Sequence, residues 1–207
     1  MSTRFEFNPI SPQALLIVIS GPSGAGKDSV LQELKRRKLP LHFVVNATTR
    51  SPRPGEVEGV DYFFVSRHRF AEMIEQNELI EYALVYDDYK GVPKAQIRQA
   101  LESGKDVILR VDVQGAQTLR KLCPEAVLVF LTVQDEQEIV ERLDRRSTES
   151  EENRKLRLAT VRKELMHISD FDYIISNREG QLEQTTETIL AIIQAEHHRV
   201  QHRKVSL

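Results

Sequence analysis

Short apolar runs and helical patterns alternate along most of the chain. The apolar runs have the length and the β-branched content of buried strands. They cover residues 15–20, 107–111, 126–133 and 171–176. Between them, apolar residues recur at helical spacing, which predicts helices near residues 28–38, 93–101, 115–122, 135–143, 154–168 and 182–193. Buried strands that alternate with helices predict an α/β fold, in which helices flank both faces of a parallel sheet.

The segment from residue 48 to residue 93 breaks this alternation. Strands are expected over residues 42–49, 60–65 and 79–86, with a turn-rich loop over 51–59 and a short helix near 70–74. The last of these strands alternates polar and apolar side chains, so one of its faces is expected to meet water. The segment 48–93 is therefore predicted to be a small antiparallel insert.

The domain boundaries follow from these patterns. Residues 145–157 are dense in charge and poor in apolar side chains, which suits a mobile lid. We expect one domain over 13–200, with a core formed by 13–47, 94–144 and 158–200. Residues 1–12 and 201–207 are expected to be flexible termini.

A phosphate-binding loop joins the first strand to the first helix. Leu15–Ser20 is followed by Gly21, four residues, Gly26 and Lys27, which is the G-x-x-x-x-G-K pattern. Glycines let the backbone N–H groups turn toward phosphate oxygens, and the helix N-terminus adds its positive dipole end. The predicted nucleotide-binding residues of this loop are Gly21, Pro22, Ser23, Gly24, Ala25, Gly26, Lys27 and Asp28.

Asp28 departs from the usual loop pattern. A Ser or Thr normally follows the lysine and binds Mg²⁺ through its hydroxyl. A carboxylate is also a hard oxygen ligand, so Asp28 is a candidate metal ligand. It also places a negative charge near the triphosphate.

Composition narrows the class of protein. The formal net charge of −2 does not favour a nucleic-acid binder, and the single cysteine excludes an internal disulfide. No apolar stretch approaches the length of a membrane span, and residues 1–14 do not have the pattern of a signal peptide. We expect a cytoplasmic or organelle-matrix enzyme with small-molecule substrates and no membrane partner.

A second set of polar residues lies in the insert. Arg50 and Arg53 are three residues apart on a proline-rich segment, and guanidinium groups bind phosphate through two parallel hydrogen bonds. Tyr62 could add a hydroxyl group. Glu81 lies in the alternating strand, where a solvent-exposed position is the alternative reading.

Five motifs in the chain resemble those of guanylate kinases. They are GPSGAGK, TTRSPRPGEVEGVDYFF, ELIEYA, VDVQGA and RLDRRSTESEE, and they span roughly residues 15–194 in the family's order. DYKGVPKAQIRQ and LRVDVQGA resemble the variety found in cyanobacteria and plant organelles. The resemblance implies a P-loop nucleoside monophosphate kinase fold, with a GMP-binding insert and a helical lid. It also implies transfer of the γ-phosphoryl group of ATP, with Mg²⁺, to GMP.

The resemblance also implies roles for particular residues. Arg50, Arg53 and Tyr62 match the residues that hold the GMP phosphate, and Glu81 matches the carboxylate that reads guanine. Asp112 matches a further carboxylate near the guanine and the metal, and Asn177 lies on the adenine side of ATP. Arg146 and Arg157 match lid arginines that act with Lys27 on the transferred phosphoryl group.

Four further positions depart from the family pattern. Asn46 replaces a Ser or Thr, and its amide is expected to donate to the guanine oxygen. Lys90 replaces a phosphate-binding Tyr, where a cation still suits phosphate. Val92 replaces a Ser or Thr that donates to guanine. Arg110 replaces an acid, and would either repel Mg²⁺ or grip phosphate.

The resulting hypothesis is a guanylate kinase of purine nucleotide metabolism that also accepts dGMP, as a monomer or a homodimer. Asp28 and Arg110 keep open a second possibility, a nucleotide- or peptide-binding module of the same fold with weak catalysis. Val92 keeps open a third, a kinase for another nucleotide or a phosphorylated sugar.

Overall fold

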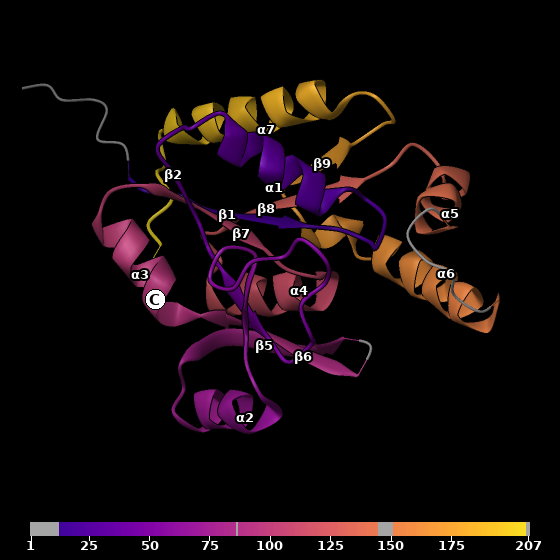
Figure 1. Cartoon of the computed structure of the whole chain (residues 1–207). Helices are drawn as coiled ribbons and strands as arrows, with labels where there is room; N and C mark the ends of the chain where they lie inside the picture. Colours follow the sequence, from indigo (N-terminus) through magenta and orange to yellow (C-terminus); the bar gives the residue numbers. More distant parts are fainter. Residues whose placement is uncertain (1–12, 86, 145–150, 206–207) are drawn as a thin grey trace, which may run out of the picture.

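The core of the protein is a five-stranded parallel sheet. The computed structural model describes residues 13–85, 87–144 and 151–205. The strands run in the order β2 (Leu41–Phe43), β7 (Asp106–Arg110), β1 (Leu16–Ser20), β8 (Val127–Thr132) and β9 (Tyr173–Ser176). All four pairings between neighbouring strands are parallel. The predicted parallel sheet is confirmed, and β1 lies at its centre (Figure 1).

Two helical layers cover this sheet. Helices α1 (Lys27–Arg36) and α7 (Leu182–His197) pack on one face, and α3 (Lys94–Glu102) and α4 (Val113–Leu122) on the other (Figure 1). Successive side chains of a strand point to opposite faces. Leu16 and Val18 of β1 therefore join the α3/α4 side, and Ile17 and Ile19 join the α1/α7 side. Both faces are buried, which is why the strand is apolar without alternation.

The insert is a second sheet, of four strands in the order β4 (Tyr62–Phe64), β3 (Asn46–Thr48), β6 (Asp88–Pro93) and β5 (Leu79–Val85). Helix α2 (Arg67–Glu75) packs against it through Phe70 and Met73. Strands β3 and β5 both pair with β6 in antiparallel orientation, but β3 pairs with β4 in parallel. The expectation of an antiparallel insert is therefore wrong for this pair, and the sheet is mixed. The long loop over residues 51–59 lets the chain return in the same direction.

Two local expectations in this region also need correction. The strand expected over residues 42–49 is two short strands, because the chain leaves the core sheet after β2 and enters the insert sheet at β3. Strand β6 was not predicted, because Gly91 and Pro93 are typical of turns. The strand needs glycine at position 91 because neighbouring side chains pack closely against it. An added Cβ would lie 2.7 Å from Leu79 and 2.9 Å from Phe70.

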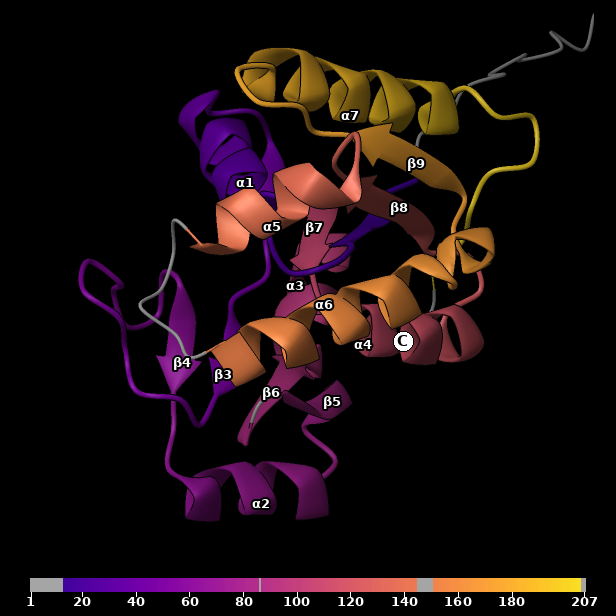
Figure 2. The ribbon, with the colours of Figure 1, turned by 90° about the vertical axis from the view of Figure 1, so that its right-hand side faces the viewer.

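Helices α5 (Glu136–Asp144) and α6 (Glu151–Leu165) lie together at one end of the core sheet (Figure 2). Asp135 caps α5, as expected, by accepting a hydrogen bond from the Glu138 N–H at 2.9 Å. The lid expected over 145–157 includes 145–150, which lie outside the described residues. Its remaining part is continuous with α6, which then leads through a 3₁₀ turn at Ile168–Asp170 to β9. Among the described residues, no helix is both long and apolar enough to cross a membrane.

The C-terminal segment is anchored to the core. Arg203 is 9% exposed and bonds Glu196, itself 1% exposed, with its Nε 2.7 Å from the carboxylate. The hydroxyl of Tyr173 donates to the same carboxylate at 2.6 Å, and Val205 packs against the core. The expectation of a flexible terminus over 201–207 is therefore wrong at Arg203 and Val205.

This buried ion pair predicts a stability effect. Removing Arg203 leaves the buried Glu196 carboxylate with only Tyr173 and the exposed Arg199 as partners, so Arg203→Met should lower the free energy of unfolding by about 3 kcal/mol. Arg199→Met is the matched control, because Arg199 pairs with the same Glu196 from a side chain that is 45% exposed. Urea unfolding of both variants tests this. Equal, small losses in the two would contradict the anchoring role of Arg203.

Candidate active site

The phosphate loop has the geometry that its sequence predicts. Gly21, Gly24 and Gly26 have φ angles of 138°, 87° and 87°, which L side chains rarely adopt. A Cβ at Gly21 would lie 1.9 Å from the carbonyl oxygen of Leu131. Helix α1 begins at Lys27, so the loop leads directly into a helix N-terminus. Several N–H groups and the dipole of α1 therefore face one site, as anion binding requires.

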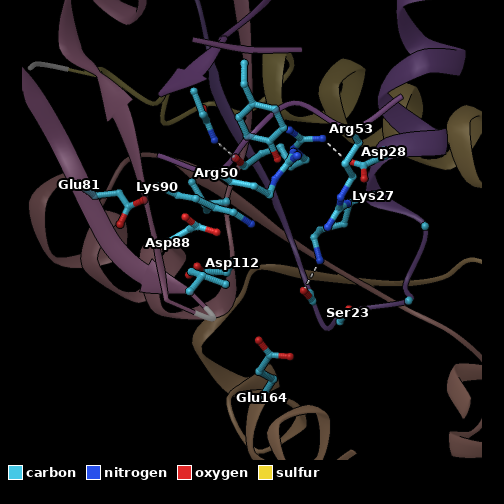
Figure 3. Close-up of a pocket in the computed structure, with 18 residues that line it drawn as sticks. Ser23, Lys27, Asp28, Arg50, Arg53, Glu81, Asp88, Lys90, Asp112 and Glu164 are labelled. Carbon is cyan, nitrogen blue, oxygen red and sulfur yellow. Dashed lines mark hydrogen bonds and ion pairs between the residues drawn. The ribbon is translucent and has the colours of Figure 1, made fainter. Parts of the chain in front are cut away.

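A cleft of about 670 Å³ opens between this loop, the insert and the end of β7 (Figure 3). Most of the predicted site residues line it, although they come from segments far apart in the sequence. The lining residues are Gly21, Ser23, Gly24, Gly26, Lys27, Asp28, Asn46, Arg50, Arg53, Tyr62, Glu81, Val85, Asp88, Lys90, Arg110, Val111, Asp112 and Glu164. Strands β1 and β7 are neighbours, so the loop and Asp112 meet at the carboxyl end of the sheet, where α/β folds bind ligands.

Other predicted residues are not brought into the cleft. Pro22 and Ala25 belong to the loop without lining the cleft. Asn177 is 4% exposed, donates to the Ala25 carbonyl at 2.9 Å and accepts from Thr185 at 3.2 Å. Asn177 therefore supports the loop through its side-chain amide, and its place on the adenine side of ATP stays a prediction. Arg146 lies outside the described residues, and of Arg157 the structure describes only the helical backbone.

Lys27 bonds the loop that precedes it. Its ammonium group donates to the carbonyl oxygens of Gly21 at 2.5 Å and Pro22 at 2.9 Å. Burial lowers the pKa of Lys27 to about 8, while the carboxylates of Glu164 and Asp28 oppose that shift. A bound anion would favour the charged form of this lysine.

Cationic side chains gather on the insert side of the cleft. Arg50 makes two hydrogen bonds to Glu56, at 2.9 and 2.8 Å, and its guanidinium lies 5.3 Å from the centre of the Tyr62 ring. Lys90 is half-buried nearby, and burial lowers its pKa. The two parallel hydrogen bonds to Glu56 fix the orientation of this guanidinium at the edge of the cleft.

Glu81 lines the same cleft from strand β5 of the insert. It is 6% exposed, and its Oε2 has no hydrogen-bond partner. Burial, with a smaller effect from the nearby Asp112 carboxylate, raises the pKa of Glu81 to about 8. A Cβ added at Gly115 would lie 2.8 Å from the Glu81 carboxyl group, so α4 approaches it closely only because that position is glycine. A buried, unpartnered carboxyl group is typical of a ligand-binding residue.

Asn46 presents a different group from the one expected. Its Nδ2 donates to the Arg110 carbonyl at 2.6 Å, while its Oδ1 is buried without a partner. The side chain therefore offers an acceptor, like Glu81, where the sequence analysis expected a donor. Val92, which pairs with Glu81 across the sheet, is fully buried in the core.

Sequence reasoning missed five residues around the cleft, one of which is Val111 after the end of β7. Asp88 and Val85 lie on the turn side of β6 and β5, and Glu164 points from α6 toward the loop (Figure 3). Burial raises the pKa of Glu164 to about 7, although Lys27 and a hydrogen bond from the Ser23 N–H oppose this. Arg142 donates to the carbonyls of Gly24 at 3.3 Å and Asn177 at 2.7 Å. No local motif marks these five, since each reaches the site only through packing.

No ready-made metal centre is found in the described part of the chain. No group of three His, Cys, Asp or Glu side chains there could hold a metal ion. Asp28, the candidate ligand, is ion-paired with Arg110. A divalent cation in this cleft would therefore depend mainly on phosphate oxygens and water for its ligands.

A family model and relatives of 41% or more identity point to one family. The model of the family described as "Guanylate kinase" matches residues 13–196. "Guanylate kinase 2, chloroplastic/mitochondrial" from rice is 47% identical over 100% of this chain and 74% of its own length. The guanylate kinase of Clostridioides difficile is 41% identical over 93% of both chains. A crystal structure of guanylate kinase from Anaplasma phagocytophilum superposes with a TM-score of 0.74 at 27% identity, covering 93% of this chain and 90% of that one.

Proposed function

Because this chain belongs to the guanylate kinase family and is an enzyme that phosphorylates GMP with ATP, we propose that its cleft holds the two substrates in two halves. ATP lies along the loop Gly21–Lys27. GMP lies against the insert, with its phosphate toward Arg50, Arg53, Tyr62 and Lys90. The base lies toward Glu81, Asp112 and Asn46.

This proposal rests on one observation: phosphate-binding groups and buried oxygen acceptors line the same cleft. Cations and a phosphate loop line this cleft, and Glu81 and Asn46 present buried oxygen acceptors in it as well. Guanine carries two adjacent N–H donors on its Watson–Crick edge, which matches these acceptors. Adenine instead offers a ring-nitrogen acceptor at the same place, so a carboxylate disfavours it.

The reaction needs positioning and charge neutralisation more than covalent help. The GMP phosphate is already ionised at neutral pH, so no general base is needed. Lys27 would bind the moving phosphoryl group, together with the lid arginines Arg146 and Arg157. Arg50 and Arg53 would hold the acceptor phosphate and neutralise part of its charge.

A divalent metal accompanies ATP in this family, and we propose that it is Mg²⁺. When bound, Mg²⁺ neutralises charge on the β and γ phosphates. The described residues offer few side chains that could bind the ion. The protein would therefore act mainly by orienting those phosphates, through the loop N–H groups and Lys27.

We further propose that the enzyme accepts dGMP, since none of the contacts inferred above involves the ribose 2′-hydroxyl. It would recycle GMP in purine nucleotide metabolism in the cytoplasm, as a monomer or a homodimer. The alternative of a binding module with weak catalysis finds no support, because the loop, Lys27 and the acceptor-side cations line one cleft.

The test is ADP release from ATP and Mg²⁺, with GMP, dGMP, AMP, CMP and UMP compared side by side. Turnover with GMP and dGMP alone is expected. Faster turnover with AMP, CMP or UMP would overturn the assignment of Glu81 as the base-reading residue. No turnover with any acceptor would overturn the kinase assignment for this chain.

Arg50→Ala tests the acceptor half of the cleft. Charge-assisted hydrogen bonds contribute about 1.5–3 kcal/mol each, so the KM for GMP should rise about 10–100-fold while the KM for ATP changes little. Arg67→Ala is the control, because Arg67 is exposed on the insert, where its side chain donates to the Asp87 carbonyl at 2.6 Å. An unchanged KM for GMP in Arg50→Ala would refute the placement of the GMP phosphate.

A further inference from the structure

Two departures from the usual residue pattern meet in the structure. Asp28 follows Lys27 in the first turn of α1, and Arg110 is the last residue of β7. They are 82 positions apart, yet their side chains form an ion pair inside the cleft. The pair therefore ties the phosphate loop to the neighbouring strand of the sheet.

Arg110 also reaches the acceptor side of the cleft. Its guanidinium lies 4.8 Å from the centre of the Tyr62 ring, on which Arg50 lies at 5.3 Å. The Arg110 side chain is 16% exposed and lines the cleft. Arg110 is thus held between a residue of the ATP half and a residue of the GMP half.

Charge explains why the two residues belong together. Asp28 alone would repel the triphosphate, and Arg110 alone would repel a divalent cation at the loop. Paired, each largely cancels the unfavourable field of the other. A carboxylate that already accepts from a guanidinium is also a weak ligand for a second cation.

Starting from the function proposed above, we propose that Asp28 is a positioning residue and not a metal ligand. It holds Arg110 over Tyr62, where the guanidinium binds the phosphate of GMP. The chain thus has a third arginine for the acceptor phosphate, in addition to Arg50 and Arg53, and its orientation depends on the residue after the loop lysine.

The first test is GMP binding without ATP or metal, measured by calorimetry. Arg110→Gln should weaken GMP binding about tenfold, the size expected for one charge-assisted hydrogen bond. Asp28→Asn should also weaken GMP binding, although Asp28 itself carries no positive charge. The double variant should bind no more weakly than Arg110→Gln, because Asp28 acts through Arg110.

Glu33→Gln and Arg36→Gln form the matched control. They remove an ion pair from the same helix, at 2.8 Å and with Arg36 74% exposed, and should leave GMP binding unchanged. Thermal unfolding of each variant verifies that it is folded.

The second measurement is the free Mg²⁺ concentration that gives half-maximal ADP release. It should be the same in wild type and Asp28→Asn. A raised Mg²⁺ requirement with unchanged metal-free GMP binding would make Asp28 a metal ligand and overturn the proposal. Independent, multiplying losses in the two single variants would overturn it as well.

Failure of the proposed function looks different. A wild-type protein that neither binds nor phosphorylates GMP refutes the function itself. A wild-type protein that does both, with variants of unchanged GMP affinity, refutes only the role of the pair.

Discussion

Lys27→Met is expected to lower kcat for GMP phosphorylation about 10²–10³-fold. Negative charge on the phosphoryl oxygens shifts during transfer. Lys27 places a cation at the start of α1, beside the phosphate loop. Loss of one preorganised donor to a developing charge costs about that factor in other enzymes. The loss should appear mainly in kcat, because the loop N–H groups still bind the phosphates of ATP.

Lys35→Met serves as the control for this substitution. It makes the same change on the same helix, at an exposed position that bonds the Val60 carbonyl at 3.3 Å. Steady-state kinetics should show wild-type kcat for this control. GMP binding to Lys27→Met should also be normal, which separates a local catalytic loss from a distorted cleft. A Lys27→Met enzyme with wild-type kcat would refute the assigned role.

The pH dependence provides a second readout for Lys27. Its pKa of about 8 in the empty protein means that the charged form is lost as pH rises through 8. Triphosphate favours the charged form, so ATP binding should take up a proton above pH 8 and weaken up to about tenfold per pH unit there. Calorimetry in buffers of different ionisation enthalpy measures this uptake, which should vanish in Lys27→Met.

The second large effect is expected at Glu81. Glu81→Gln replaces one oxygen acceptor with an NH₂ donor, which would face an N–H of guanine. The unpaired buried donors should lower kcat/KM for GMP at least about 100-fold, because a site built for specific hydrogen bonds strongly rejects a mismatch. An amide can instead accept from the adenine amino group and donate to its ring nitrogen, so the ratio of AMP to GMP turnover should rise.

The same residue predicts a pH dependence of opposite sign to that of Lys27. Glu81 has a pKa of about 8 in the empty protein and is therefore largely protonated at pH 7. Guanine donors require the carboxylate form, so GMP binding should release a proton below pH 8. Affinity for GMP should therefore rise up to about tenfold per pH unit as pH increases toward 8, and then level off.

Calorimetric titration with GMP from pH 6 to pH 9 measures both the affinity and the released proton. Glu81→Gln should show neither the slope nor the release. Glu78→Gln is a suitable control, because Glu78 is a nearby glutamate of the insert paired with Arg69 at 2.8 Å. The contacts of GMP with Arg110 or Arg50 would not produce this pH dependence, since arginine stays charged over this range. A flat wild-type profile would refute the ionisation of Glu81 on GMP binding.

Sequence reasoning was most accurate where a few neighbouring residues decide the structure. The strand Leu16–Ser20, the glycine positions of the loop and the start of α1 all follow from about a dozen consecutive positions. Continuous apolar runs predicted the buried parallel strands, because a strand covered on both faces leaves no place for polar side chains.

It was least accurate where distant segments choose their partners. The parallel pairing of β3 with β4, the break between β2 and β3, and the strand through Gly91 depend on which sheet each segment joins. Arg203 was expected to be flexible because its basic neighbourhood suggests a solvated tail. Only its buried partner Glu196, seven positions earlier but on α7, shows otherwise.

The sequence by itself therefore determined the phosphate loop, the parallel core and the chemical character of the site, since these depend on short-range spacing and residue type. The tertiary structure alone decided that Asn177 supports the loop through its side-chain amide, that Glu164 points toward it, and that Arg110 is held by Asp28. Side chains choose partners according to packing between segments that are tens of residues apart. Local patterns contain no information about that packing.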